Sequence, residues 1–457
     1  MAAIPGGLET DRGPPLSVPL RHFLVGLACL LAGVVLGSLS VQGDLPGRAD
    51  LAQLHVLLVG WIAVTIMGAM TQFVPVWSGI ALHSRRLANV QLWLVGTGLL
   101  AFAFALFTGR FDWLPLGAAI MLVGFWVFVY NVGRTLLRGR PWDVTEAHFA
   151  FALGCVLAVT ALGATLAVGL TRPILGGTNL THGSVRMAHA TLALYGIVLT
   201  TVFGALYQLG TMFTQSELYG VDHWFRRIEC YGFPVGVAAL TTGRLFDHLA
   251  LARLGASLVV VAVFAFSLLL ARRLYGAQTS WTPMLSRYAV VAASMAGWAL
   301  WTAPFWIRDP LHPSTLYGAP GAFHLLTFGV VGFVVLGTLY HVIPFIVWVH
   351  RYSDRLGLEA VPMIDDLYDD RLARADFLAL IVGFGALVLA DVVDVSPVVV
   401  ALGGLSVTVG VVMFCTNVVV LLHRHSPRSL PTILFGSIAR DEGDPERPET
   451  NRRTPDR

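Results

Sequence analysis

Two histidines occur in the same local pattern in two apolar segments that lie far apart in the chain. His55 is followed by glycine after five and thirteen residues and by proline after twenty, and His324 is followed by the same residue types at the same offsets. The glycine pair occurs a third time between them, and projecting back from it puts Thr191 in the position of the two histidines, with His189 two residues earlier. We call residues 55, 191 and 324 the slot positions. They lie 136 and 133 residues apart, so the sequence predicts a threefold internal repeat.

The matched imidazoles could ligate a metal ion or a haem iron. Counted from Asp50 and from the turn at Gly318, both histidines lie about one or two helical turns into an apolar segment, at the same depth. Two imidazoles at equal depth can hold the iron of a haem between them. Iron is favoured over zinc or copper because no cysteine or carboxylate stands beside either histidine. The alternative is that each histidine is a hydrogen-bonded packing residue within a membrane helix.

The amino-acid composition indicates that these helices lie in a membrane. Hydrophobic residues make up 56% of the 457 positions, charged residues 12%, and the mean hydropathy is +0.72, which excludes a soluble globular domain. We predict an all-α polytopic membrane protein with twelve transmembrane helices in three repeats of four, occupying residues 20–425. The predicted spans are 20–41, 51–79, 87–108, 114–133, 147–170, 185–210, 228–246, 249–271, 288–305, 319–347, 376–393 and 398–422.

The distribution of arginine predicts the orientation. The chain contains no lysine, and its arginines concentrate in the even-numbered loops, for example at Arg85, Arg138 and Arg273. The positive-inside rule then places both termini in the cytoplasm and the protein in the cell membrane. Residues 1–19 are expected to form a cytoplasmic tail, and the charged segment 437–457 is expected to be disordered. A net charge of +3 gives no reason to expect a nucleic-acid partner.

Two further residues are candidates near the slot positions. His189 could move into the slot through a bulge in its helix and serve a second haem or a metal, or it could simply donate a hydrogen bond. Arg186 could pair with a haem propionate, since guanidinium matches a carboxylate, although arginine also lies at membrane interfaces without a ligand. Asp391 and Asp394 are expected only to cap helix ends. The four cysteines lie in separate spans with no CxxCH motif, which excludes a c-type haem attachment site.

Two stretches resemble subunit I of the haem-copper oxygen reductases, in particular the cbb-type oxidases and the bacterial nitric oxide reductases. Met67–Pro75, with the sequence MGAMTQFVP, is similar to the end of the second helix of that family, and His324–Pro344 is similar to its tenth. The resemblance implies twelve helices in three arcs with both termini inside. It also implies that His55 and His324 are the axial ligands of one low-spin haem b.

The chain departs from that family at the catalytic metals. Ala322 stands where the tenth helix of the family carries the ligand of the high-spin haem, the seventh span has no histidine, and the slot on the sixth is Thr191. A second haem or a copper ion is therefore not expected, and neither is the usual binuclear chemistry. We expect one-electron transfer in a respiratory or nitrogen-oxide pathway, with a quinol or copper protein as donor and an oxidase-like companion subunit. The alternatives are an atypical oxygen or nitric oxide reductase that uses His189, and a nonenzymatic transporter that handles haem or metal.

Overall fold

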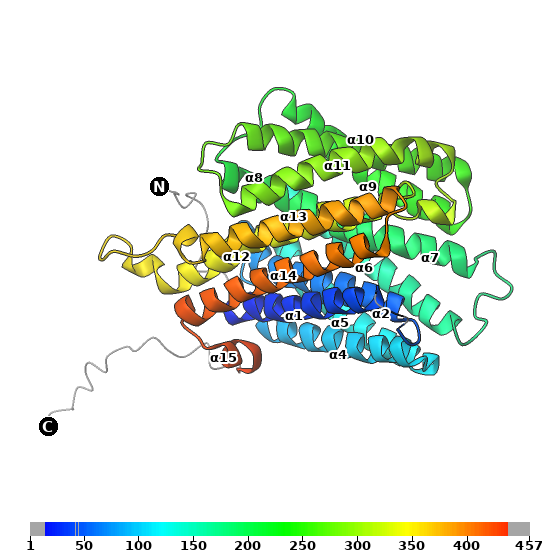
Figure 1. The fold of residues 1–457 in the computed structure, drawn as a ribbon, viewed down its shortest axis with the longest axis horizontal. Coiled ribbons are helices and arrows are strands. Elements are labelled where there is room, and N and C mark those ends of the chain that lie inside the picture. Colours follow the sequence, from blue (N-terminus) through cyan, green and yellow to red (C-terminus); the bar gives the residue numbers. More distant parts are fainter. Residues whose placement is uncertain (1–13, 42, 44, 437–457) are drawn as a thin grey trace.

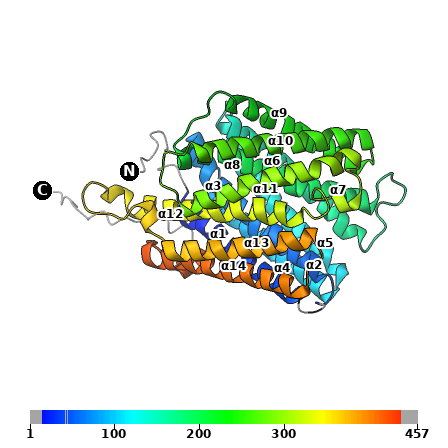
Figure 2. The ribbon, with the colours of Figure 1, turned by 45° about the horizontal axis from the view of Figure 1, so that its top comes forward.

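The computed structural model describes residues 14–41, 43 and 45–436, and this part of the chain is helical without a β-strand. The predicted disordered segment 437–457 and residues 1–13 of the predicted N-terminal tail lie outside it. The long helices run side by side along a common direction (Figures 1 and 2). Eleven of them are long and apolar enough to cross a membrane: Ser17–Ser40, Ala49–Ser78, Arg85–Thr108, Phe111–Arg138, Val144–Gly169, His182–Thr214, Leu249–Tyr275, Pro283–Arg308, Leu325–Arg351, Asp370–Val392 and Pro397–His425. The chain is thus a multi-pass membrane protein.

The helices fall into three successive groups of four. In each group the second membrane helix is made of α-helical and π-helical segments joined end to end. The first repeat consists of α1 (Ser17–Ser40), α2–η2–α3 (Ala49–His55, Val56–Ala63, Val64–Ser78), α4 (Arg85–Thr108) and α5 (Leu114–Arg138). The second consists of α6 (Val144–Gly169), α7–η4–α8 (His182–Thr191, Leu192–Leu199, Thr200–Thr214), α9 (Asp222–Leu245) and α10 (Leu249–Tyr275). The third consists of α11 (Pro283–Arg308), η6–α12 (Leu325–Gly332, Phe333–Arg351), α13 (Asp370–Val392) and α14 (Pro397–His425).

Each slot position is directly followed by eight residues of π-helix. The segments η2, η4 and η6 begin at Val56, Leu192 and Leu325, one residue after the slot. The fifth residue of each π-helix is a glycine, and a methyl group added there would lie within 2.9 Å of a small side chain on the first helix of the same repeat. These pairs are Gly60 with Cys29, Gly196 with Cys155, and Gly329 with Ser294. π-Helical turns are rare and occur mostly at functional sites, so the threefold pattern in the sequence corresponds to a threefold feature of the backbone.

At the ends of the helices away from the slot positions, polar residues occupy equivalent positions in the three repeats. The second glycine of each repeat packs on the Cβ atom of a basic residue of the first helix, and a polar residue about two turns into the third helix is buried. The basic residues are His22, His148 and Arg287, and the third-helix residues are Gln91, Glu229 and Asp376. Asn131 and Asn417 on the fourth helices each bond both backbone groups of the residue that precedes α4 and α13. These contacts show that the repeats share their packing and not only their length.

Helix α9 is of span length but falls below the hydropathy of the eleven others. It carries Asp222, Arg226, Arg227, Glu229 and Arg244 within 24 residues. It nevertheless packs along the whole of α10, with close glycine contacts near its C-terminus and an ion pair between Asp222 and Arg272 at its N-terminus. The burial of Glu229 and Arg244 explains how a helix of this composition is accommodated in the bundle.

The two ends of the described chain meet at one end of the bundle. Arg21 at the start of α1 donates hydrogen bonds of 2.8 Å to the carbonyl oxygens of Ile433 and Gly436, beyond α14. We call this the His148 end, because His148 at the start of α6 also lies there, and we call the other the His55 end. At the His55 end the loops before α2 and η6 pack on the ends of α4 and α13.

Candidate functional site

The His55 side chain is fixed in a defined orientation at the end of α2. Its Nδ1 atom lies 2.8 Å from the carbonyl oxygen of Leu51 one turn earlier, and since a carbonyl only accepts, Nδ1 carries the proton. The Nε2 atom, which has no hydrogen bond within the described residues, is then the available donor of an electron pair. The ring packs on Phe102 of α4 at a centroid distance of 4.9 Å and is half-buried.

His189 is oriented in the same manner and lies near His55. Its Nδ1 atom is 3.0 Å from the carbonyl oxygen of Val159 on α6, and a methyl group on Gly163 would approach its ring to 3.0 Å. His55 is close enough to interact electrostatically with it. His55 follows the start of α2 by six residues and His189 follows the start of α7 by seven, which places both about 10 Å into the helices. The two imidazoles therefore lie at a similar depth, although within the described residues neither a hydrogen bond nor a ring contact joins them.

His324 has a different set of partners. Both its backbone N–H and its Nδ1 atom lie 2.9 Å from the carboxylate of Asp391, near the end of α13. A carboxylate in this position fixes the imidazole tautomer and leaves Nε2 available, as in many metal sites. Asp391 is thus more than the helix cap that was expected. Within the described residues, neither a hydrogen bond nor a ring contact joins His324 to His55 or His189.

The pseudo-threefold arrangement explains why the three histidines have different neighbours. Each slot residue faces the third helix of its own repeat: His55 contacts Phe102, Thr191 accepts a hydrogen bond from Arg244, and His324 bonds Asp391. Residues in equivalent positions consequently point into different spaces between the helices. His189 precedes its slot by two residues, a rotation of about 200° on a helix, and so points away from α9 and packs on α6, the first helix of its own repeat. The two-residue offset therefore gives His189 a neighbour on α6, whereas Thr191 bonds Arg244 of α9.

Two arginines at the His55 end have contrasting environments. Arg186, one turn before His189, is exposed and interacts electrostatically with Tyr317. Arg244 is 2% exposed and was not a candidate from the sequence. It donates to Thr191 and to carbonyl oxygens of the loop after α11, at Pro310, Thr315 and Leu316. The signal that could have identified it is its position in the repeat, fifteen residues after Glu229, as Asp391 follows Asp376.

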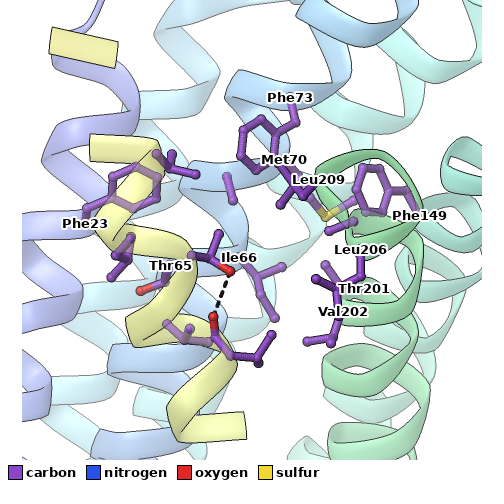
Figure 3. A pocket seen from close by; sticks show the side chains of 17 residues that line it. Phe23, Thr65, Ile66, Met70, Phe73, Phe149, Thr201, Val202, Leu206 and Leu209 are labelled. Atoms are coloured by element: carbon purple, nitrogen blue, oxygen red, sulfur yellow. Dashed lines mark hydrogen bonds between the residues drawn. The ribbon is translucent and has the colours of Figure 1, made fainter. Parts of the chain in front are cut away.

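A cavity of about 70 Å³ lies between the second helices of the three repeats (Figure 3). Its lining comes from equivalent positions of α3, α8 and α12, with one phenylalanine each from α1 and α6. Ile66, Val202 and Val335 form one such set, and Met70, Leu206 and Leu339 form another. None of the histidines described above lines this cavity, whose wall is almost entirely apolar. It marks the pseudo-threefold axis and is separate from the histidine site.

No family model matches the chain, and no curated protein matches it.

Proposed function

We propose that the protein is a membrane b-type haem protein that binds one low-spin haem through His55 and His189. The observation that supports the proposal is a pair of half-buried imidazoles at a similar depth in the first two repeats, which interact electrostatically and each have Nδ1 bonded to a backbone carbonyl and Nε2 available. Low-spin haem iron accepts such a pair of neutral imidazoles. The proposal keeps the haem expected from the sequence and changes one of its ligands.

The surroundings of the two histidines fit a haem better than a bare metal ion. Only imidazole nitrogens are offered as ligands, and the adjoining side chains are apolar. The Phe102 ring packs on His55 at an interplanar angle of 51°, and Leu99, Ala105 and Ala118 belong to a small buried cluster of α4 and α5 beside it. Gly163 accommodates the His189 ring, which a methyl group there would approach to 3.0 Å. When bound, a haem with two imidazole ligands supplies reversible one-electron exchange. The protein's part is to hold both imidazoles in one tautomer through the carbonyl oxygens of Leu51 and Val159.

His324 is retained as the second candidate for the partner of His55. Its support is the shared register of the sequence and the carboxylate that orients its ring. Arg186 is proposed as a propionate partner, since it lies one turn from His189 and is exposed at the His55 end.

The wider context is proposed from the helix order and the arginine distribution. Both ends of the described chain meet at the His148 end, which requires an even number of crossings and supports α9 as a twelfth span. With the arginine-rich loops inside, the termini are cytoplasmic and the haem lies near the outer face of the cell membrane. A quinol or a copper protein would be the electron donor there, and an oxidase-like subunit the companion. The proposed degenerate relationship to haem-copper oxidase subunit I accounts for the same arrangement.

Haem content of purified full-length variants tests the proposal. We expect one haem per chain and a low-spin reduced spectrum in the wild type, lost in His55→Ala and His189→Ala and kept in His324→Ala. His341→Ala is the matched control, because His341 is a half-buried histidine of α12 that packs on Phe213 towards the His148 end. Loss in His324→Ala with retention in His189→Ala would restore the ligand pair expected from the sequence. A wild type that binds no haem refutes the proposal altogether.

The same preparation separates the alternative functions. A shift of the reduced spectrum with carbon monoxide would reveal an open iron site and favour an atypical reductase. Haem that is lost on dilution would favour a haem-handling transporter. An unshifted spectrum that survives dilution supports electron transfer.

A further inference from the structure

Three side chains with metal-binding atoms converge at the His148 end, away from the proposed haem. His148 on α6 and Glu229 and Cys230 on α9 have ligand atoms that all lie within 4.8 Å of one another. The Nε2 atom of His148 is 2.9 Å from one carboxylate oxygen of Glu229, and the Sγ atom of Cys230 is 3.5 Å from the other. His148 is 4% exposed and Glu229 is fully buried, while Cys230 is half-buried.

We propose that His148, Glu229 and Cys230 bind one divalent transition-metal ion of the zinc type. Nitrogen, oxygen and sulfur ligands in one set suit zinc and cobalt, whose bonds of about 2.0–2.3 Å place neighbouring ligands about 3.3–3.7 Å apart in a tetrahedron. The sulfur already lies at such a distance from one oxygen of Glu229. The nitrogen lies 2.9 Å from the other oxygen, from which it needs to separate by only about half an ångström, and nitrogen and sulfur, which lie within 4.8 Å of each other, can be drawn together by the metal. Tyr207, whose hydroxyl is 2.7 Å from Glu229, lies where a fourth ligand or its supporting group is required.

The other repeats pack at the equivalent positions without this set of an imidazole, a carboxylate and a thiol. In the third repeat the equivalent positions hold Arg287 and Asp376, a buried ion pair to which Tyr340 also donates a hydrogen bond. Arginine stays protonated and cannot ligate a metal, so that pair only holds helices together. Phe377 stands where the second repeat has Cys230. The second repeat alone combines an imidazole, a carboxylate and a thiol at these positions.

The charge balance also favours a metal ion. Glu229 is buried without an arginine partner, since the described ion pair of this carboxylate is with His148. The charged groups that face the cluster are Asp143, which interacts with His148, and Arg226, which interacts with Cys230. Arg273 on α10 instead bonds the carbonyl oxygens of Leu206 and Tyr207. A dication with one carboxylate and one thiolate is neutral as a unit, which lowers the cost of burying it, and its binding releases the thiol proton.

Cobalt titration of the metal-depleted, full-length protein in detergent tests the site. We expect one Co²⁺ per chain and a near-ultraviolet charge-transfer band from the thiolate. Cys230→Ser should abolish the band, and Glu229→Gln or His148→Asn should weaken binding by about tenfold or more. Cys415→Ser is the matched control, because Cys415 is a buried thiol near Asp376 in the third repeat.

Each outcome bears on this proposal and not on the haem. Absence of the band in the wild type, its survival in Cys230→Ser, or its equal loss in Cys415→Ser overturns the metal site. Gel filtration and thermal unfolding test whether Cys230→Ser is folded. Because Cys230 is only half-buried, this substitution should destabilise the fold less than the substitutions of His148 and Glu229. His55→Ala should retain the cobalt band while losing haem, and Cys230→Ser should retain haem.

Discussion

The buried ion pair of the third repeat allows a quantitative test of the packing argument. Arg287 and Asp376 are both fully buried, and Asp376 also accepts a hydrogen bond from Tyr340. The Arg287 guanidinium bonds the carbonyl oxygens of Pro283 and Ala373 and lies 4.6 Å from the Tyr340 ring centroid. Replacing Asp376 with asparagine removes the charge and keeps the shape. It leaves a buried cation without a counter-ion, which should lower the free energy of unfolding by about 3–5 kcal/mol.

The first repeat provides a neutral solution for the same positions. There His22 and Gln91 stand where the third repeat has Arg287 and Asp376, and both are buried. The double variant Arg287→His with Asp376→Gln should therefore be considerably more stable than Asp376→Asn alone, because it contains no unpaired charge. Asp370→Asn is the matched control. Asp370 pairs with Arg374 at 3.7 Å on the exposed surface of the same helix, where a pair contributes about 0–1 kcal/mol.

Unfolding in mixed micelles, followed by tryptophan fluorescence, measures these differences. The chain has twelve tryptophans, among them the fully buried Trp298, Trp306 and Trp348, so the signal reports on the core. A loss in Asp376→Asn no larger than that in Asp370→Asn would show that the pair is not desolvated. A double variant as unstable as the single one would show that the repeats do not share an interchangeable polar position. Either result would refute the reasoning.

Three further predictions use other local features. Gly255→Ala should strongly destabilise the α9–α10 pair because the added methyl group overlaps the backbone nitrogen of Leu240, whereas Gly96→Ala meets open space and should gain about 0.5–1 kcal/mol in the same unfolding assay. Asp391→Asn should leave the haem reduction potential unchanged if His189 is the ligand, while a potential that rises would identify His324. The backbone N–H groups of Leu372 and Arg371 hold the pKa of Asp369 below its usual value. The contribution of Asp369 to the stability of the folded protein should therefore be present at neutral pH and lost as the pH falls below about 4. Asp369→Ala should lack this pH dependence of unfolding.

The helices were predictable from hydropathy except where charge interrupts it. The predicted span 51–79 agrees closely with the observed Ala49–Ser78, because both ends coincide with polar residues. The predicted span 228–246 misses the first turns of α9, since Asp222, Arg226 and Arg227 lower the hydropathy there. The predicted span 319–347 starts too early, because residues 319–321 form a turn with a positive φ of 81° at Gly321. The two errors come from a local backbone or charge effect, and the membrane crossing of α9 stays a prediction.

The register of the slot positions was also predictable, whereas the direction of their side chains was not. Spacing along the chain shows that His55 and His324 are equivalent, and the π-helix after each agrees with that equivalence. Equivalence under a threefold rotation means that the two imidazoles face different neighbours. The sequence contained the offset of His189 from Thr191, but its meaning depends on the third helix of each repeat. Arg244 and Asp391 were missed as slot partners for the same reason.

The three repeats differ where chemistry is possible and agree where packing is tight. The glycines of the π-helices meet a cysteine or a serine in all three repeats, and these close contacts leave no space for variation. The spaces beside the slots have diverged, with Phe102 beside His55, Arg244 beside Thr191 and Asp391 beside His324. A scaffold of this kind can lose a site in one repeat and keep another without altering the fold, because the residues that differ are not the ones that set the helix contacts. On this reasoning we expect variants of His324 and Asp391 to keep the proposed haem, provided that α2 and α7 still hold His55 and His189 at a similar depth.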